Sequence, residues 1–125
     1  MNILLLGAGM QGKAALHDLW RNPEVTKIVA ADGDLPALRR HVRERGYGDK
    51  VACESVAAEN PASILRLMAA HPDVVIDLLP SRFSPLVGQA ALRSRVHLVN
   101  TVYVLPGMRE LAADIAAAGL TFLPE

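Results

Sequence analysis

The 125-residue sequence lacks several features that mark common classes of protein. Its single cysteine, Cys53, excludes an internal disulfide, and none of the four histidines pairs with it at metal-ligand spacing. No apolar run approaches the roughly 20 residues that a membrane-spanning helix needs. The N-terminus does not have the form of a secretory signal. We therefore expect a cytoplasmic protein with no metal site and no membrane partner.

An excess of charge of one sign is also missing, because 13 Lys and Arg residues balance 13 Asp and Glu residues. The one basic cluster holds four arginines between positions 39 and 45, and Glu44 interrupts it. Aromatic residues make up only 4% of the chain and do not alternate with these arginines, as they do in many nucleic-acid-binding surfaces. We interpret the cluster as the solvated face of a helix and expect no nucleic-acid partner.

The sequence does contain a regular alternation of short apolar runs with segments of helical periodicity. Hydrophobic residues make up 51% of the chain, enough for the core of one domain at this length. Buried strands are expected at residues 2–6, 27–31, 51–56, 74–79, 98–104 and 120–123. Helices between them predict an α/β fold, a doubly wound parallel sheet with helices on both faces. Right-handed crossovers favour the strand order 3-2-1-4-5-6.

Helix boundaries are marked by local signals. The pair Asn60-Pro61 is a typical helix start, with Asn as the cap and proline in the first turn, and Ser84-Pro85 is expected to start another helix. The last helix is expected over residues 108–116, with Gly119 ending it.

The first expected strand is followed by the spacing G-x-G-x-x-G, at Gly7, Gly9 and Gly12. Between a strand and a helix, this pattern is typical of the phosphate-binding turn of a dinucleotide-binding (Rossmann) fold. Gly7 would allow the tight turn, Gly9 the approach of a pyrophosphate, and Gly12 the packing of helix against strand. Backbone N–H groups near Met10, Gln11 and Gly12 would then face the phosphate oxygens at a helix N-terminus.

Asp32 provides an independent check on this interpretation. It stands twenty residues after Gly12 at the end of the second strand, where an acid binds the adenosine ribose hydroxyls of a dinucleotide. The alternative is a carboxylate that caps the next helix, but Asp34 is better placed for that. A carboxylate would repel the 2′-phosphate of NADP, and Gly33 offers no cation to bind it, so NAD is the expected cofactor.

Three segments are more specific than the glycine pattern, and they extend the stretch MNILLLGAGMQGKAALHDLW that contains it: VVIDLLPSRFSPLVGQAAL, RVHLVNTVYV and GLTFLPE. Together they resemble the N-terminal dinucleotide-binding domain of the saccharopine dehydrogenase and reductase family, which includes related lysine dehydrogenases. The resemblance covers nearly the whole chain. It implies an oxidoreductase that transfers hydride between a nicotinamide cofactor and a carbon–nitrogen bond of an amino-acid-type substrate.

The resemblance also implies site residues and a domain organisation. The glycine turn, Met10 and Gln11 included, matches the family's phosphate loop, and Asp32 matches its ribose acid. Leu79 and Pro80 match a segment that runs along the cofactor, and Thr101 a segment near the nicotinamide. In that family the final Leu-Pro leads into a substrate and dimerisation domain. Residues 1–125 are therefore expected to be the dinucleotide-binding domain of a longer, homodimeric enzyme, inactive alone, with catalytic residues that this sequence does not identify.

Two other functions stay open at this point. One is a nucleotide-sensing regulatory module of the kind that gates potassium transporters, which would bind a nucleotide without catalysis. The other is a domain of the same fold that has lost its ligand and keeps its glycines only for packing.

Four more residues carry open alternatives. Arg82 is either an exposed loop residue or a ligand for a cofactor phosphate or substrate carboxylate. Tyr103 is expected to pack at the end of a strand, with proton donation as the alternative. Asp77, inside an apolar strand, needs partners such as a loop backbone, with a catalytic role as the alternative. His97 begins a strand, so we expect it to lie away from the ligand crevice.

Overall fold

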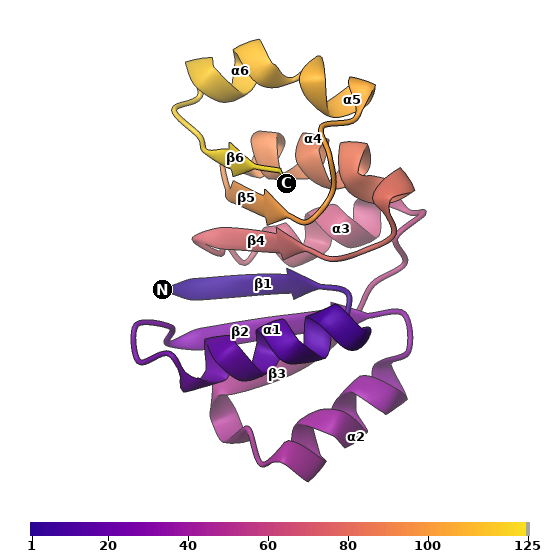
Figure 1. The fold of residues 1–125 in the computed structure, drawn as a ribbon, viewed down its shortest axis with the longest axis vertical. Helices are drawn as coiled ribbons and strands as arrows, with labels where there is room; N and C mark the ends of the chain where they lie inside the picture. The colour runs from indigo at the N-terminus through magenta and orange to yellow at the C-terminus, as the bar shows by residue number, and fades with distance from the viewer. Residues whose placement is uncertain (125) are drawn as a thin grey trace.

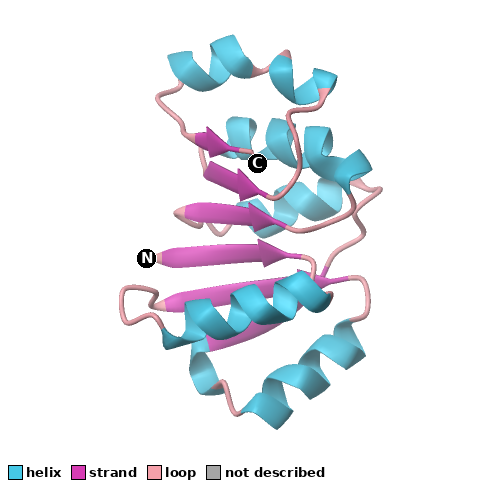
Figure 2. Cartoon of the chain, in the orientation of Figure 1, coloured by secondary structure: helices cyan, strands magenta, loops and turns pink. Residues whose placement is uncertain are grey.

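Six parallel strands form the centre of the structure, a computed structural model that describes residues 1–124 (Figure 1). Their order, β3-β2-β1-β4-β5-β6, confirms the prediction. The strands are β1 (Asn2–Leu6), β2 (Lys27–Asp32), β3 (Val51–Ser55), β4 (Val74–Asp77), β5 (His97–Asn100) and β6 (Phe122–Leu123). Because all six run in the same direction, their carboxyl ends lie at one edge of the sheet, as the arrowheads in Figure 2 show.

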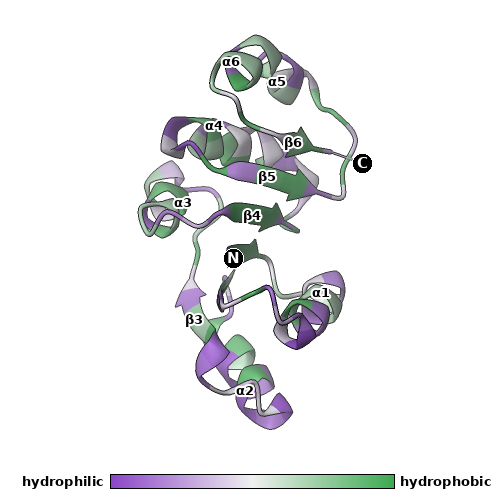
Figure 3. Ribbon diagram, turned by 90° about the vertical axis from the view of Figure 1, so that its left-hand side faces the viewer, coloured by the Kyte–Doolittle hydropathy of each residue, from purple (hydrophilic) through white to green (hydrophobic). Residues whose placement is uncertain are grey.

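Helices cover both faces of the sheet (Figure 3). One face carries α1 (Met10–Arg21) and α2 (Leu35–Arg45), and the other carries α3 (Pro61–Met68) and α4 (Ser84–Ser94). Two short helices, α5 (Pro106–Arg109) and α6 (Ala112–Ala117), lie beside the last strands. Single 3-10 turns, η1 (Gly48–Lys50) and η2 (Ser81–Phe83), complete the regular structure. No helix within residues 1–124 has the length and apolar character to cross a membrane.

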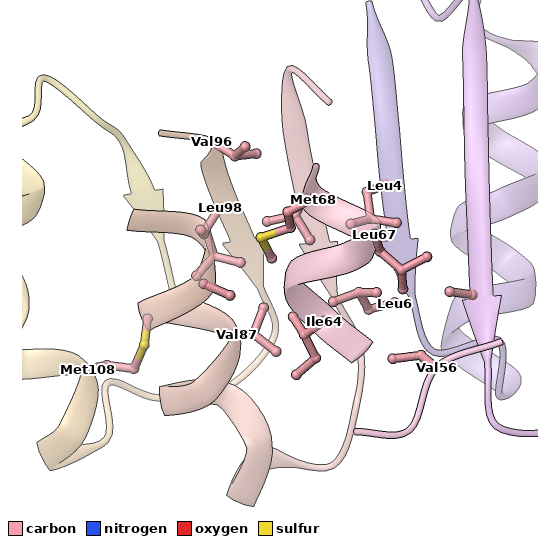
Figure 4. Close-up of a cluster of buried hydrophobic side chains, with 14 residues drawn as sticks. Leu4, Leu6, Val56, Ile64, Leu67, Met68, Val87, Val96, Leu98 and Met108 are labelled. Atoms are coloured by element: carbon pink, nitrogen blue, oxygen red, sulfur yellow. The ribbon is translucent and has the colours of Figure 1, made fainter. Parts of the chain in front are cut away.

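The central strand β1 contributes to two hydrophobic cores, one on each face of the sheet. Leu4 and Leu6 pack in the core under α3 and α4, which Figure 4 shows together with Met108 of α5. Ile3 and Leu5 pack in the opposite core under α1 and α2. Full burial of one such side chain stabilises the fold by roughly 1.5–3 kcal/mol. The continuous apolar run at the N-terminus is thus explained by a strand buried on both faces.

The expected helix starts at Asn60-Pro61 and Ser84-Pro85 are confirmed in position, and of the two only Asn60 caps its helix with a side chain, because α4 begins at Ser84 without a side-chain cap. The Asn60 side chain accepts a hydrogen bond of 3.1 Å from the Ala62 N–H at the start of α3, where Pro61 stands in the first turn. Asp34 does the same for α2 and accepts 3.0 Å from the Ala37 N–H. Such caps contribute about 1 kcal/mol each. All four arginines of the basic cluster are exposed, as expected for a solvated face.

Two strands are shorter than the sequence predicts. The expected strand 74–79 ends at Asp77, and the expected strand 98–104 ends at Asn100. In both, an oxygen of the last side chain accepts a hydrogen bond from the backbone N–H two residues further on, at Leu79 and at Val102. These Asx turns take the chain out of the sheet, so side-chain chemistry rather than hydrophobicity ends the strands.

The region after β5 corrects two more expectations. The single helix predicted over 108–116 is divided into α5 and α6, because the Leu111 N–H bonds to the Met108 carbonyl only three residues back and tightens the turn. The last strand is confined to β6 rather than spanning 120–123. Gly119, with a φ of 68°, does end the helical segment as expected.

Candidate functional site

Two glycines of the β1–α1 turn are required by the protein's own packing. Gly7 has a φ of +93°, and a Cβ there would lie 2.7 Å from the carbonyl oxygen of Leu78, at the end of β4. A Cβ at Gly12 would overlap the carbonyl group of Gly7. Any side chain at either position would therefore displace backbone atoms, and both predicted roles, tight turn and helix packing, agree with this geometry.

Gly9 differs because none of the described residues, 1–124, requires a glycine there. Its φ is −66°, and a Cβ would meet no atom within 4 Å. Gly9 is the N-cap residue of α1 and has no side chain that could accept from the first N–H groups of the helix. The first turn of α1 also contains no acidic residue. The exposed residues Met10 and Gln11 begin this turn. The helix thus presents unpaired backbone N–H groups beside open space, which is the geometry that receives a phosphate.

The Asp32 carboxylate joins this turn to the end of β2. One oxygen accepts a hydrogen bond of 2.7 Å from the Ala8 N–H inside the glycine turn. The other accepts 2.8 Å from the Asp34 N–H. The sequence did not indicate the contact with Ala8, because only the backbone of that residue takes part. Each carboxylate oxygen has more than one acceptor site, so ribose hydroxyls can still bind.

Leu79 and Pro80 follow β4, the neighbour of β1, and their segment touches the glycine turn. The Leu78 N–H donates to the Leu6 carbonyl at 2.8 Å, which extends the β1–β4 pairing up to the turn. The structure therefore brings the Leu79 backbone nitrogen, 3.2 Å from the place of a Gly7 Cβ, next to the glycine turn, and Pro80 follows it in the loop. Thr101 is exposed after β5, on the same edge but two strands away from β1.

Asp77 is 2% exposed and finds the partners that its burial requires. Its two carboxylate oxygens accept hydrogen bonds from the Leu79 N–H at 3.1 Å and from the Ser84 hydroxyl at 3.0 Å. The loop-backbone contact was expected, but the sequence showed Ser84 only as a helix start. Burial raises the pKa of Asp77 from its ordinary value of 3.8, and the two hydrogen bonds oppose that rise.

The raised pKa of Asp77 gives a test of the fold. The folded chain holds the Asp77 proton up to a higher pH than the unfolded chain does, so this group makes the protein less stable as pH rises from about 4 through the raised pKa. Asp77→Asn removes that proton equilibrium. We expect the free energy of unfolding of the variant, relative to wild type, to increase with pH across this window in urea titrations. A difference that stays constant with pH would contradict the assignment.

The other three candidates lie outside the glycine turn. Tyr103 does not pack at the strand end as expected: it is 77% exposed, because the turn at Asn100 leads the chain away from the sheet. Arg82 is exposed, and its guanidinium lies 4.4 Å from the centre of the Phe83 ring. His97 accepts a hydrogen bond from the Thr121 N–H at the amino end of β5, on the opposite edge from the glycine turn.

An apolar hollow of about 390 Å³ opens beside the carboxyl end of β5, between the last strands and the two short helices. Asn100 and Tyr103 line it on the strand side, and Met108 and Ile115 on the helix side. Thr101 directly follows Asn100, one of the residues that line the hollow. Within residues 1–124, no group of three or more His, Cys, Asp or Glu side chains is arranged to hold a metal ion.

Together, these features define a class of protein. A doubly wound parallel sheet, a glycine turn with open space at its helix N-terminus and an acid at the end of the adjacent strand are the features of a dinucleotide-binding domain. Ligands of such sheets bind outside the carboxyl ends of the strands, which is the edge where these features meet.

Comparison with known proteins assigns the chain to one family. Residues 3–123 match the family model described as the saccharopine dehydrogenase NADP binding domain, so the chain belongs to that family. A nicotinamide dinucleotide is therefore its cofactor, and the resemblance seen in the sequence is confirmed.

Individual relatives agree. The chain is 31% identical over 124 residues to saccharopine dehydrogenase [NADP(+), L-glutamate-forming] of Saccharomyces cerevisiae. This match covers 99% of the chain and 26% of the relative. It is 27% identical to the mitochondrial alpha-aminoadipic semialdehyde synthase of Bos taurus, over 98% of the chain and 13% of that protein. The apo structure of the yeast saccharopine dehydrogenase superposes with a TM-score of 0.85 at 29% identity, covering 99% of this chain and 26% of that one. The chain thus spans about a quarter or less of the length of these relatives.

Proposed function

We propose that this chain is the cofactor domain of an oxidoreductase that transfers hydride between a nicotinamide and a carbon–nitrogen bond of an amino-acid-type substrate. The observation that carries the proposal is the unconstrained Gly9, beside the Asp32 carboxylate, in a chain of this family. The names of the relatives, saccharopine dehydrogenase and alpha-aminoadipic semialdehyde synthase, support a substrate of that class.

The cofactor proposed for this chain is NAD rather than NADP, although the family model and the yeast relative are named for NADP. Support comes from Asp32, whose carboxylate lies at the end of β2, where an acid binds the ribose in this fold, and from the exposed Gly33 beside it, which supplies no positive charge. A 2′-phosphate near that carboxylate would meet like-charge repulsion and lose hydration without a compensating cation.

We expect the chain to bind NADH at least about tenfold more tightly than NADPH in calorimetric titrations at low salt. The reason is the repulsion between the Asp32 carboxylate and the 2′-phosphate. Gly33→Arg is the matched variant: a Cβ at Gly33 meets only the Val56 carbonyl, at an ordinary 3.8 Å, so the arginine should be accommodated and should reduce the preference. Equal or tighter binding of NADPH by the wild-type chain would overturn the NAD proposal.

The proposed reaction requires the full-length protein, because the chain covers only a quarter of the yeast relative. We expect that protein to reduce NAD⁺ in the presence of saccharopine or a related secondary amine formed from an amino acid, measured by absorbance of NADH. The 125-residue chain alone should give no turnover. Binding of NADH by a full-length protein that oxidises none of these amines would instead favour a nucleotide-sensing module.

A further inference from the structure

The buried pair Asp77 and Ser84 closes the loop between β4 and α4. Asp77 is the last residue of β4, and Ser84, 0% exposed, is the first of α4. The Asp77 carboxylate accepts from the Ser84 hydroxyl at 3.0 Å with one oxygen and from the Leu79 N–H at 3.1 Å with the other. One side chain thus fixes both ends of residues 78–83, the loop that contains Leu79 and Pro80.

This loop packs directly against the glycine turn. The Leu78 carbonyl oxygen approaches to 2.7 Å from the place where a Cβ of Gly7 would stand, so loop and turn are in close backbone contact. The Leu78 N–H also donates to the Leu6 carbonyl, one residue before the turn. A shift of the loop by a few tenths of an ångström must therefore move Gly7 or open a gap beside it, because packed backbone atoms have no other room.

We propose that Asp77 is a positioning residue for cofactor binding: through Leu79 and Ser84 it holds the 78–83 loop against the glycine turn, without touching the cofactor itself. The inference rests on the proposed function of this site. The groups that face Asp77 are uncharged: Leu6 of β1 and Asn100 of β5 are its partners in register, and α4 contributes Ser84. The carboxylate therefore acts through its two hydrogen bonds, not through an ion pair.

The test compares NADH affinity among three variants, at a temperature where each is fully folded by circular dichroism. Asp77→Ala removes both acceptors and should weaken NADH binding about tenfold. Asp77→Asn should restore most of the affinity, because its carbonyl oxygen can accept from Leu79 and its amide can donate to Ser84. The NADH affinity of Ser84→Ala, which keeps the carboxylate, should lie between those of wild type and Asp77→Ala. This variant replaces Asp77→Ala in the comparison if Asp77→Ala does not fold.

Asp73 provides a matched control at the other end of the same strand. It precedes β4, and its carboxylate accepts 2.6 Å from the Asn2 N–H at the amino edge of the sheet. Asp73→Ala should lower the melting temperature and leave NADH affinity unchanged. Equal losses of NADH affinity in Asp73→Ala and Asp77→Ala would overturn the proposal. Wild-type NADH affinity in both Asp77→Ala and Ser84→Ala would also overturn it. So would failure of Asp77→Asn to restore binding.

A second measurement separates this proposal from the proposed function. Amide hydrogen exchange at Ala8, whose N–H bonds to Asp32 in the glycine turn, needs no cofactor. We expect faster exchange at Ala8 in Asp77→Ala or Ser84→Ala, but not in Asp73→Ala. If the wild-type chain bound neither NADH nor NADPH, the proposed function would fail, and unchanged exchange at Ala8 would then overturn the positioning role as well.

Discussion

Gly9→Val is expected to weaken the binding of nicotinamide dinucleotides by about 100-fold or more, equivalent to roughly 3 kcal/mol, while the fold is retained. A Cβ at Gly9 meets no protein atom within 4 Å, and its φ of −66° is one that any residue adopts. The valine methyl groups would instead occupy the space through which a pyrophosphate reaches the N–H groups of α1. Loss of affinity without loss of stability is therefore the signature of a ligand-imposed glycine.

The measurement is a titration with NADH followed by fluorescence or calorimetry, beside thermal unfolding of the same samples. Gly46→Ala is the matched control, since Gly46 ends α2 with a φ of +65° and also has no atom within 4 Å of a Cβ. It should lose about 1 kcal/mol of stability and no affinity. Gly12→Ala should show the opposite of Gly9→Val and fail to fold stably, because its Cβ overlaps the Gly7 carbonyl. Wild-type affinity in Gly9→Val would mean that the pyrophosphate does not pass over this turn.

Asp32→Ala is expected to weaken NADH binding by more than about tenfold without producing a chain that prefers NADPH. The substitution removes the acceptor for the ribose hydroxyls, and it also removes the acceptor of the Ala8 N–H, a bond of 2.7 Å. Ala8 is 8% exposed, so its N–H has little access to water as a replacement partner. The glycine turn should therefore loosen, and both dinucleotides should lose affinity.

The check is a pair of titrations, with NADH and NADPH, on wild type, Asp32→Ala and Asp32→Asn. Asparagine keeps one acceptor oxygen and removes the charge. It therefore separates the repulsion of the 2′-phosphate by the carboxylate from the hydrogen bond that holds the glycine turn. We expect it to raise NADPH affinity relative to NADH while losing less total affinity than alanine does. If Asp32→Ala instead bound NADPH as tightly as the wild type binds NADH, the carboxylate would serve only to repel the 2′-phosphate.

The sheet order and the glycine turn could be predicted because their signals are local. Apolar runs, a glycine spacing and an acid twenty residues later each occupy a short stretch of sequence, and right-handed crossovers determine the rest. The assignment of Asp34 and Asn60 as caps succeeded for the same reason, since a cap bonds only to its own helix.

The errors came where bonds across the fold or inside turns decide. The predicted strands extend too far past Asp77 and Asn100. The apolar residues around them do not indicate that these two side chains accept hydrogen bonds from the backbone that follows. The expected packing of Tyr103 failed as a consequence of the second of these turns. The hydrogen bond from Ala8 to Asp32 joins residues 24 positions apart. Because its donor is a backbone N–H, which every residue except proline has, the sequence pattern could not predict it.

Three of the strands, β2, β4 and β5, end on Asp32, Asp77 and Asn100, and each of these side chains accepts the N–H two residues onward. The last residue of each of these strands is thus bonded to the first residues of the loop that follows it. The point at which each loop leaves the sheet is therefore set by the side chain at the end of its strand. The ligand edge of the sheet is therefore shaped by three acceptor side chains, and replacing any one of them would release the start of its loop.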